Sequence, residues 1–268
     1  MSEPKDINYE PLLALNGVWW LSLRSTARAW GSILIIIFVA LSLLVSPFLG
    51  FDVAAGIGVL YCVVVSTRVT RLKNAAWWQF ATANGWFLDT ETPLGTVTPP
   101  SLQFGHSQVY SPIIQAQLGN LTCDLLTYRC TTGYGRNEQT HNFTIACLAL
   151  PQTLPHMLLL SKKAHIDAQR DLENAETLQL EGDFNDSFSL QIDKGQEVNA
   201  LVFITPDVMQ TLVDYNTNED IEILGTNLYF IVNKDERNYR DMQVIVKSVT
   251  ELGQRIVQNT KIATPAAV

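Results

Sequence analysis

Residues 30–67, WGSILIIIFVALSLLVSPFLGFDVAAGIGVLYCVVVST, decide the architecture of this chain. The segment contains two apolar runs, Trp30–Ser46 and Val53–Val65, which meet at a short turn in residues 46–52. A helix needs about 20 apolar residues, and at least about 17, to span the 30 Å or so of hydrocarbon in a bilayer. The first run meets that limit without a charge, and the second meets it only if its polar flanks lie in the headgroup layers. We therefore predict a transmembrane hairpin at residues 30–67; the alternative is a buried hairpin of a soluble protein.

The basic residues around the hairpin predict its orientation. Two arginines precede the first run, and two arginines and a lysine follow the second, whereas the turn carries only Asp52. These cations are Arg24, Arg28, Arg68, Arg71 and Lys73. Positively charged flanks remain on the cytoplasmic side of a membrane. We therefore expect a protein of the plasma (inner) membrane that has the lipid bilayer as a partner and both termini in the cytoplasm.

Small residues recur at every fourth position from the turn through the second run. They are Gly50, Ala54, Gly58, Cys62 and Ser66, and this spacing places them on one face of a helix. Small side chains let two helix backbones approach closely in lipid. The stripe predicts packing against the first run of the same chain or, alternatively, association of two copies through this face.

Charge is distributed unevenly along the chain. Residues 1–73 hold six basic and four acidic residues, a net charge of +2, and the remainder holds 12 basic and 22 acidic residues, a net charge of −10, which together give −8. An acidic domain repels the phosphates of nucleic acids and of anionic lipids. We therefore expect neither a nucleic-acid partner nor a domain that lies flat on the membrane. The four cysteines form no CxxC pair, which indicates reduced thiols in a cytosolic domain.

The chain divides into five predicted parts. They are an N-terminal tail and interfacial helix at 1–29, the hairpin at 30–67, a juxtamembrane helix and connector at 68–90, a cytosolic domain at 91–258 and a disordered tail at 259–268. We expect the juxtamembrane helix to continue the second run and to end at Asn84-Gly85, where glycine supplies a left-handed residue.

The cytosolic domain has the residue patterns of an α+β fold. Alternating apolar residues predict a hairpin of Leu121–Arg129 and Thr140–Leu148, joined by TTGYGRNEQ. Apolar residues at helical spacing in Met242–Val257 predict an amphipathic C-terminal helix. We therefore expect a mostly antiparallel β-sheet followed by this helix.

Shorter elements are expected between the first hairpin and the C-terminal helix. Ala200–Ile204 has the composition of a strand, and Thr205-Pro206-Asp207 has the residues that begin a helix. A second hairpin is predicted from residues 221–224 and 228–232, with its turn at Gly225.

A resemblance rests on the stretch Glu181–Val232. The matching parts are Gly182-Asp183-Phe184, the strand Phe188–Ile192, Ile204-Thr205-Pro206-Asp207 with Met209 and Leu212, and the closing LYFI strand. On these residues the chain resembles a family of bacterial membrane proteins catalogued only as a domain of unknown function. Members of that family have two N-terminal apolar spans and an aromatic-rich helix that ends in Asn-Gly, as Phe80–Trp86 does here. The chain lacks an arginine that the family has near Ala200, and the resemblance implies an architecture but no activity.

His141, Cys123 and Cys147 are the candidate chemical residues. On the predicted hairpin Cys123 lies roughly opposite Cys147, and all three side chains are expected on one sheet face, where they could ligate zinc or form a cysteine–histidine nucleophile. The simpler interpretation is a histidine at the end of a strand beside buried thiols. His106 and His156 are expected in loops without partners, and Glu219, Asp220 and Glu222 on a solvated rim, so we predict neither a metal nor another cofactor.

These features favour a binding function over an enzymatic one. We expect a membrane-tethered cytosolic interaction or regulatory module whose partner is another membrane protein or a second copy of the chain. The alternatives are a membrane-tethered hydrolase or thiol enzyme that uses the candidate residues above, and an accessory subunit of a transport complex.

Overall fold

A computed structural model describes residues 7–13, 47–89, 98–110, 113–163, 172, 175–215, 219–233 and 239–262. For the helical residues 47–59, 215, 239–241 and 259–262 it describes the backbone alone. The chain divides into two compact units, one at Asn8–Ala83 and the other formed by Met1–Ile7 with Asn84–Val268.

The first unit is dominated by one long helix, α3, which extends from Pro47 to Ala83. Proline is tolerated in the first helical turn because its missing N–H would have no intrahelical partner there. The helix includes most of the predicted turn at residues 46–52, so the expectation of a non-helical turn there was wrong. The predicted end of the helix is confirmed, because the turn Asn84-Gly85 follows Ala83 and Gly85 has a φ of +68°.

The short helix α1 (Glu10–Leu13) lies against α3. The ring of Tyr9 stacks on that of Phe80 at a centroid distance of 5.7 Å, and Leu12 is fully buried. Within the residues that the structure describes, no helix is both long and apolar enough to cross a membrane. The first predicted span, Trp30–Ser46, lies outside those residues.

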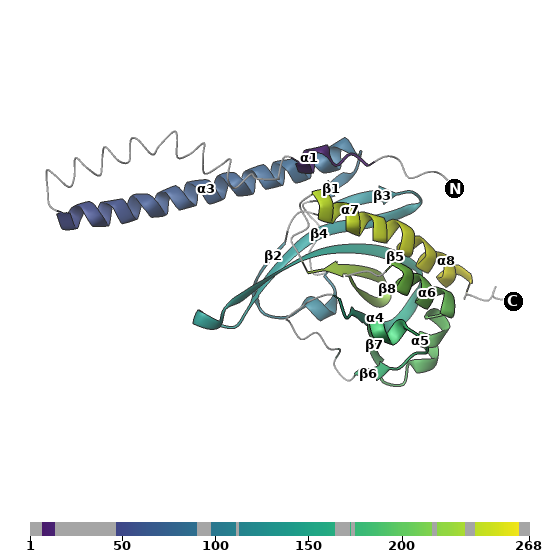
Figure 1. The fold of residues 1–268 in the computed structure, drawn as a ribbon. Coiled ribbons are helices and arrows are strands. Elements are labelled where there is room, and N and C mark those ends of the chain that lie inside the picture. Colours follow the sequence, from purple (N-terminus) through teal and green to yellow (C-terminus); the bar gives the residue numbers. More distant parts are fainter. Residues whose placement is uncertain are drawn as a thin grey trace. The chain divides into compact units, whose positions relative to one another are not determined.

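The second unit is built on an antiparallel sheet of eight strands (Figure 1). The strands are β1 (Phe87–Asp89), β2 (His106–Tyr110), β3 (Ile113–Leu118), β4 (Leu121–Thr132), β5 (Gln139–Ser161), β6 (Ala175–Leu178), β7 (Phe188–Asp193) and β8 (Asp220–Val232). The prediction of an α+β fold with a mostly antiparallel sheet is confirmed. The order of the main path is β1-β3-β4-β5-β7-β6, with β2 paired to β4 and β8 paired to β5.

Strand β5 changes partners along its length. On one side it pairs with β4 as far as Leu148 and with β7 from Met157 onward. On the other side it pairs with β8 in both halves, with register shifts between Ala149 and Met157. The two prolines of this segment, Pro151 and Pro155, lack the N–H that a ladder requires, which explains why regular pairing stops here.

Strand β8 follows the bend of β5. Gly225 pairs with Leu154 at the register shift and has a φ of +61°, a conformation that glycine adopts without a steric penalty. The predicted second hairpin at residues 221–232 was therefore wrong, because the chain does not reverse at Gly225 but continues as one strand.

The two faces of the sheet are both covered. One face holds a cluster of buried side chains that includes Tyr128, Phe143, Ile145, Tyr229 and Ile231. The other carries the predicted C-terminal helix, which consists of α7 (Tyr239–Ser248), a π-helical segment (Val249–Gly253) and α8 (Gln254–Ile262). A Cβ on Gly253 would lie 3.4 Å from the side chain of Leu148, so the helix approaches β5 closely at this residue.

Three short helices lie between β6 and β8 in the chain. Helix α4 (Phe184–Ser187) precedes β7, whereas α5 (Glu197–Phe203) and α6 (Pro206–Tyr215) follow it. The expected start of α6 at Thr205-Pro206-Asp207 is confirmed. The strand expected at Ala200–Ile204 was wrong, because α5 occupies most of it. Ala200 and Phe203 are buried at helical spacing, and this tertiary packing overrides the β-propensity of the neighbouring valines.

The β4–β5 hairpin forms an arm that projects beyond the rest of the sheet (Figure 1). Strand β2 pairs with β4 near the end of the arm, with His106 opposite Thr131. Two glycines permit close backbone contacts there. A Cβ on Gly105 would lie 2.4 Å from the carbonyl oxygen of Thr131, and a Cβ on Gly133 would lie 2.2 Å from that of Asn137.

The Gly133→Ala substitution should destabilise the domain by about 2–4 kcal/mol, because the added Cβ overlaps backbone atoms and φ is positive. Gly135→Ala is the matched control in the same turn: its φ is +63°, no atom lies within 4 Å of the added Cβ, and it should lose only about 1 kcal/mol. Urea unfolding of the full chain, followed by circular dichroism, measures both. Equal losses would contradict the close contact.

Candidate functional site

The structure does not bring the predicted chemical residues together. Cys123 pairs with Leu148, and Cys147 pairs with Asp124, so the register is one residue away from the expected one. Because neighbouring residues of a strand point to opposite faces, the thiols of Cys123 and Cys147 lie on opposite sides of the sheet. His141 shares a face with Cys147 but is six residues away on β5, which corresponds to about 20 Å along a strand. The prediction that all three side chains share one site was wrong.

His141 instead has a structural environment near the end of the arm. Its cross-strand partner is Cys130, and its Nε2 atom lies 2.8 Å from the hydroxyl oxygen of Thr132. The imidazole packs against the rings of Phe104 and Phe143 at centroid distances of 6.0 and 6.4 Å. A buried histidine with a hydrogen-bonded nitrogen and aromatic neighbours needs no ligand to explain its position.

The two candidate thiols, Cys123 and Cys147, are buried. Burial raises the pKa of Cys123 well above its usual value, and the nearby Cys147 and Asp124 raise it further. Burial, together with the charge of Asp124, raises the pKa of Cys147 to about 12. Since the thiolate is the reactive form, the raised pKa of both side chains disfavours reaction near neutral pH. This counts against the alternative of a thiol enzyme built on Cys123 and Cys147, which stays a prediction.

The predicted small-residue stripe lies on α3. Of the small-residue stripe, Cys62 and Ser66 are exposed on α3, whereas Gly50, Ala54 and Gly58 belong to the part of α3 whose backbone alone is described. No cluster of three or more histidine, cysteine or acidic residues suited to a metal ion occurs among the described residues.

Three acidic residues expected on a solvated rim are buried at the start of β8: Glu219, Asp220 and Glu222. Each accepts a hydrogen bond from a different part of the domain. Ser248 Oγ donates to Glu219 Oε1 at 2.9 Å, and the backbone N–H of Ser161 donates to Asp220 Oδ1 at 2.6 Å. A buried carboxylate is tolerated only when such partners replace water. These three side chains therefore connect β8 to the C-terminal helix, to the end of β5 and to the segment before β2.

Glu222 lies at the centre of a polar arrangement with His156 and Ser101. Its Oε1 lies 2.8 Å from His156 Nε2, and the backbone N–H of Ser101 lies 3.3 Å from both carboxylate oxygens. The other ring nitrogen of His156, Nδ1, lies 4.0 Å from Asp193 Oδ1. His156 was expected in a loop without partners, and this was wrong, because it lies within β5 between two carboxylates.

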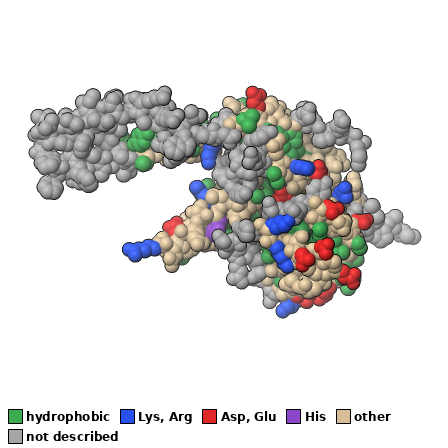
Figure 2. Space-filling view, in the orientation of Figure 1, with side chains coloured by type: hydrophobic (Ala, Val, Ile, Leu, Met, Phe, Trp, Pro, Cys, Tyr) green, Lys and Arg blue, Asp and Glu red, His purple; other side chains and the backbone are tan. Residues whose placement is uncertain are grey.

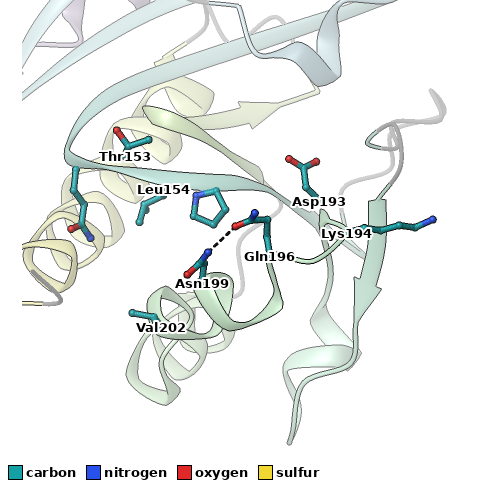
Figure 3. Close-up of a pocket in the computed structure, with 9 residues that line it drawn as sticks. Thr153, Leu154, Asp193, Lys194, Gln196, Asn199 and Val202 are labelled. Carbon is teal, nitrogen blue, oxygen red and sulfur yellow. Dashed lines mark hydrogen bonds between the residues drawn. The ribbon is translucent and has the colours of Figure 1, made fainter.

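A pocket of about 590 Å³ lies next to this arrangement, where β5 has left β4 and not yet joined β7. It is lined by Gln152, Thr153, Leu154 and Pro155 of β5 and by Asp193, Lys194, Gln196, Asn199 and Val202 from the end of β7 and α5. Figure 3 shows Gln196 and Asn199 joined by a hydrogen bond of 2.8 Å on the side of α5, while Lys194 points away from them. Four of the nine lining residues have amide or hydroxyl side chains and two are charged, so polar groups form most of the lining, which suits recognition by hydrogen bonds.

Helix α5 also exposes an apolar face at the border of the pocket. The exposed fractions of Val198, Leu201 and Val202 are 74%, 46% and 57%. These positions are three and four residues apart, so the side chains are neighbours on one helix face. Residues 175–215 around them hold eight acidic residues and one lysine, a net charge of −7. Figure 2 shows acidic side chains concentrated over this part of the surface.

Sequence patterns gave little indication of this site. His156 and Asp193 are 37 positions apart, so the sequence does not show that they meet. The acidic residues at the start of β8 precede an apolar run, and exposed acidic residues occur in the same pattern, so the pattern does not show that they are buried. The one available signal was the pair of prolines at 151 and 155 inside an apolar stretch, because proline in a strand marks an edge or a bulge.

Comparisons with known proteins add no relatives, since no family model, curated protein or solved structure matches the chain. The resemblance to a family of bacterial membrane proteins stays a prediction.

Glu219 predicts a pH dependence of stability. Burial raises its pKa to about 7, against the opposing effect of the hydrogen bond from Ser248. Because the unfolded carboxyl group loses its proton near pH 4.5, the folded state binds more protons between these values, and stability decreases as pH rises from about 4.5 to 7. The total loss corresponds to about 3 kcal/mol.

The Glu219→Gln variant should lack this loss, so that its stability relative to the parent increases by about 3 kcal/mol between pH 4 and pH 8. Ser248→Ala should move the transition to higher pH, because it removes the donor that favours the carboxylate. Urea unfolding at a series of pH values measures all three proteins. Parallel curves for the parent and Glu219→Gln would contradict the assignment.

Proposed function

We propose that this chain is an integral membrane protein whose cytosolic α+β domain is a tethered interaction or regulatory module. The domain would bind a protein partner through the apolar face of α5 and the adjoining pocket. When the partner is a larger membrane protein, the chain would act as an accessory subunit, and a transport complex is one such assembly.

The observation that supports a binding role is the exposed face of α5. Val198, Leu201 and Val202 form a contiguous apolar group on a domain whose other large apolar side chains are mostly buried. Contiguous apolar groups with a polar border are typical of protein–protein contact sites. The pocket beside Val202 supplies that border, because its amide and hydroxyl groups can hydrogen-bond a partner's main chain or polar side chains.

The proposed tether rests on the composition of residues 30–67 and on the continuity of α3. Trp30–Ser46 is long enough and apolar enough to span a bilayer. Helix α3 contains the second apolar run and continues without interruption to Ala83, immediately before the sheet domain begins. The basic residues that flank both runs favour the plasma (inner) membrane with both termini in the cytoplasm.

The full chain should remain in the membrane pellet after extraction with alkaline carbonate, because the apolar runs cannot leave the hydrocarbon without exposing their side chains to water. Deletion of residues 30–67 should transfer the protein to the soluble fraction. Immunoblotting of both fractions measures the distribution. Release of the full chain by carbonate would contradict the proposed anchor.

The combined substitutions Val198→Ser, Leu201→Ser and Val202→Ser should remove the partner. They replace apolar contact area with hydroxyl groups and leave the buried side of α5 unchanged. The measurement is quantitative mass spectrometry of proteins that co-purify with the tagged full chain from native membranes, with a differently tagged second copy co-expressed. We expect at least one protein to decrease about tenfold or more, the loss that central contact residues produce.

Val244→Ser is the matched control for this experiment. Val244 is also an exposed valine, with an exposed fraction of 53%, but it lies on α7. This variant should retain the same proteins as the parent. If the α5 variant and the control keep identical sets of co-purified proteins, α5 is not the binding surface.

A further inference from the structure

The tip of the β4–β5 arm presents two side chains that commonly anchor protein interfaces. Tyr134 has an exposed fraction of 82%, and Arg136 lies two residues further along, in the 3₁₀ turn Gly135–Asn137. Tyrosine and arginine are enriched among residues that dominate binding energy, because they combine a large contact area with directional hydrogen bonds. Figure 2 shows the basic end of the arm projecting into solvent.

The tip is held in position by contacts that involve β2. The ring of His106 stacks on that of Tyr134 at a centroid distance of 4.8 Å and an interplanar angle of 15°, and its Nε2 lies 2.8 Å from the carbonyl oxygen of Gly133. Ser107 has a φ of +54°, which is unusual for a residue with a side chain and marks a backbone held by its surroundings. Tyr134 is therefore ordered before any partner arrives, which lowers the entropy lost on binding.

The arm and the α5 region differ in charge. Residues 126–141 of the arm hold two arginines and one glutamate, a net charge of +1, whereas residues 175–215 have a net charge of −7. In the turn itself Arg136 is followed by Glu138, so the positive charge at the tip is that of a single arginine. Arg136 is attracted to an acidic surface, and the acidic α5 region repels anionic lipid headgroups, so this region favours contact with a protein over contact with the membrane.

A carboxylate pair beside α5 offers a place for the arginine. The carboxyl groups of Glu176 and Glu197 interact, which raises the pKa of Glu176 and lowers that of Glu197. Glu176 Oε1 is buried and has no hydrogen-bond partner among the described residues. A guanidinium group is planar and can donate to both carboxyl groups.

The same copy cannot make this contact. Figure 1 shows the tip of the arm and helix α5 at opposite ends of the domain; β5 runs from the arm to the part of the sheet that α5 contacts. We propose that the arm of one copy docks on the α5 face of a second copy, with Tyr134 against Val198, Leu201 and Val202 and with Arg136 beside Glu197. This inference rests on the proposed function, in which α5 is the binding surface, and it identifies the partner as the chain itself.

Photo-crosslinking tests the contact directly. Tyr134 is replaced by p-benzoylphenylalanine in the full chain, light and heavy isotope-labelled copies are mixed in detergent, and crosslinked peptides are identified by mass spectrometry. We expect mixed light–heavy peptides that join position 134 to residues 197–203. No mixed peptides, or mixed peptides that join position 134 to another part of the domain, would overturn the proposal.

Charge substitutions test the same contact by affinity. Arg136→Glu should raise the dissociation constant of self-association, measured by sedimentation in detergent, by about tenfold or more. Lys247→Glu is the matched control, because it makes the same charge change at an exposed position of α7, and it should have no effect. A mixture of Arg136→Glu copies with Glu197→Arg copies should recover most of the affinity, since the new pair has opposite charges.

The outcomes separate this inference from the proposed function. If Arg136→Glu and Lys247→Glu associate equally well, or the mixture recovers nothing, self-association through the arm is wrong. If, in addition, the serine variant of α5 still loses a different co-purified protein, the domain remains an interaction module with another partner. If that variant loses none, both ideas fail.

Discussion

The pairing of strand β5 is the constraint on which the rest of the domain depends. Strand β5 is 23 residues long and has only two edges, one of which is paired with β8. Strands β4 and β7 must therefore share the other edge, β4 as far as Leu148 and β7 from Met157. The interval between them contains two prolines that cannot donate to a ladder, and β8 bends there at Gly225. The pocket is a consequence of this division, since it occupies the interval that neither strand fills.

The buried acidic residues of β8 extend this constraint to the surrounding elements. Glu219 contacts the C-terminal helix, Asp220 the end of β5, and Glu222 both His156 and the segment before β2. Burying a carboxylate without a partner costs several kcal/mol, so an arrangement that separated these elements would be strongly disfavoured. We infer that the three carboxylates add little net stability but favour one packing of the helix and loops over others, at the place where regular strand pairing is interrupted.

Local patterns were sufficient for elements whose side chains alternate or recur regularly. The first hairpin and the C-terminal helix could be predicted because one face of each is apolar. The start of α6 could be predicted because Thr205-Pro206-Asp207 are residues that begin a helix. The pattern could not give the register of Cys123 and Cys147, because the hairpin turn contains a 3₁₀ helix that shifts the pairing by one residue. Helix α5 was missed because its exposed valines resemble a strand, and the site was missed because His156, Asp193 and Glu222 meet only when three distant strands pair.

Two complementary surfaces on one chain have a thermodynamic consequence in the proposed assembly. Copies anchored in one bilayer share an orientation, so a closed pair requires a two-fold axis perpendicular to the membrane, with each arm on the other copy's α5. Anchoring also raises the effective concentration of the second copy, so a weak contact suffices. The closed pair occupies both α5 faces, and any other protein that uses α5 must therefore displace an arm. Self-association and binding of that protein then compete, and the density of the chain in the membrane sets the balance between them.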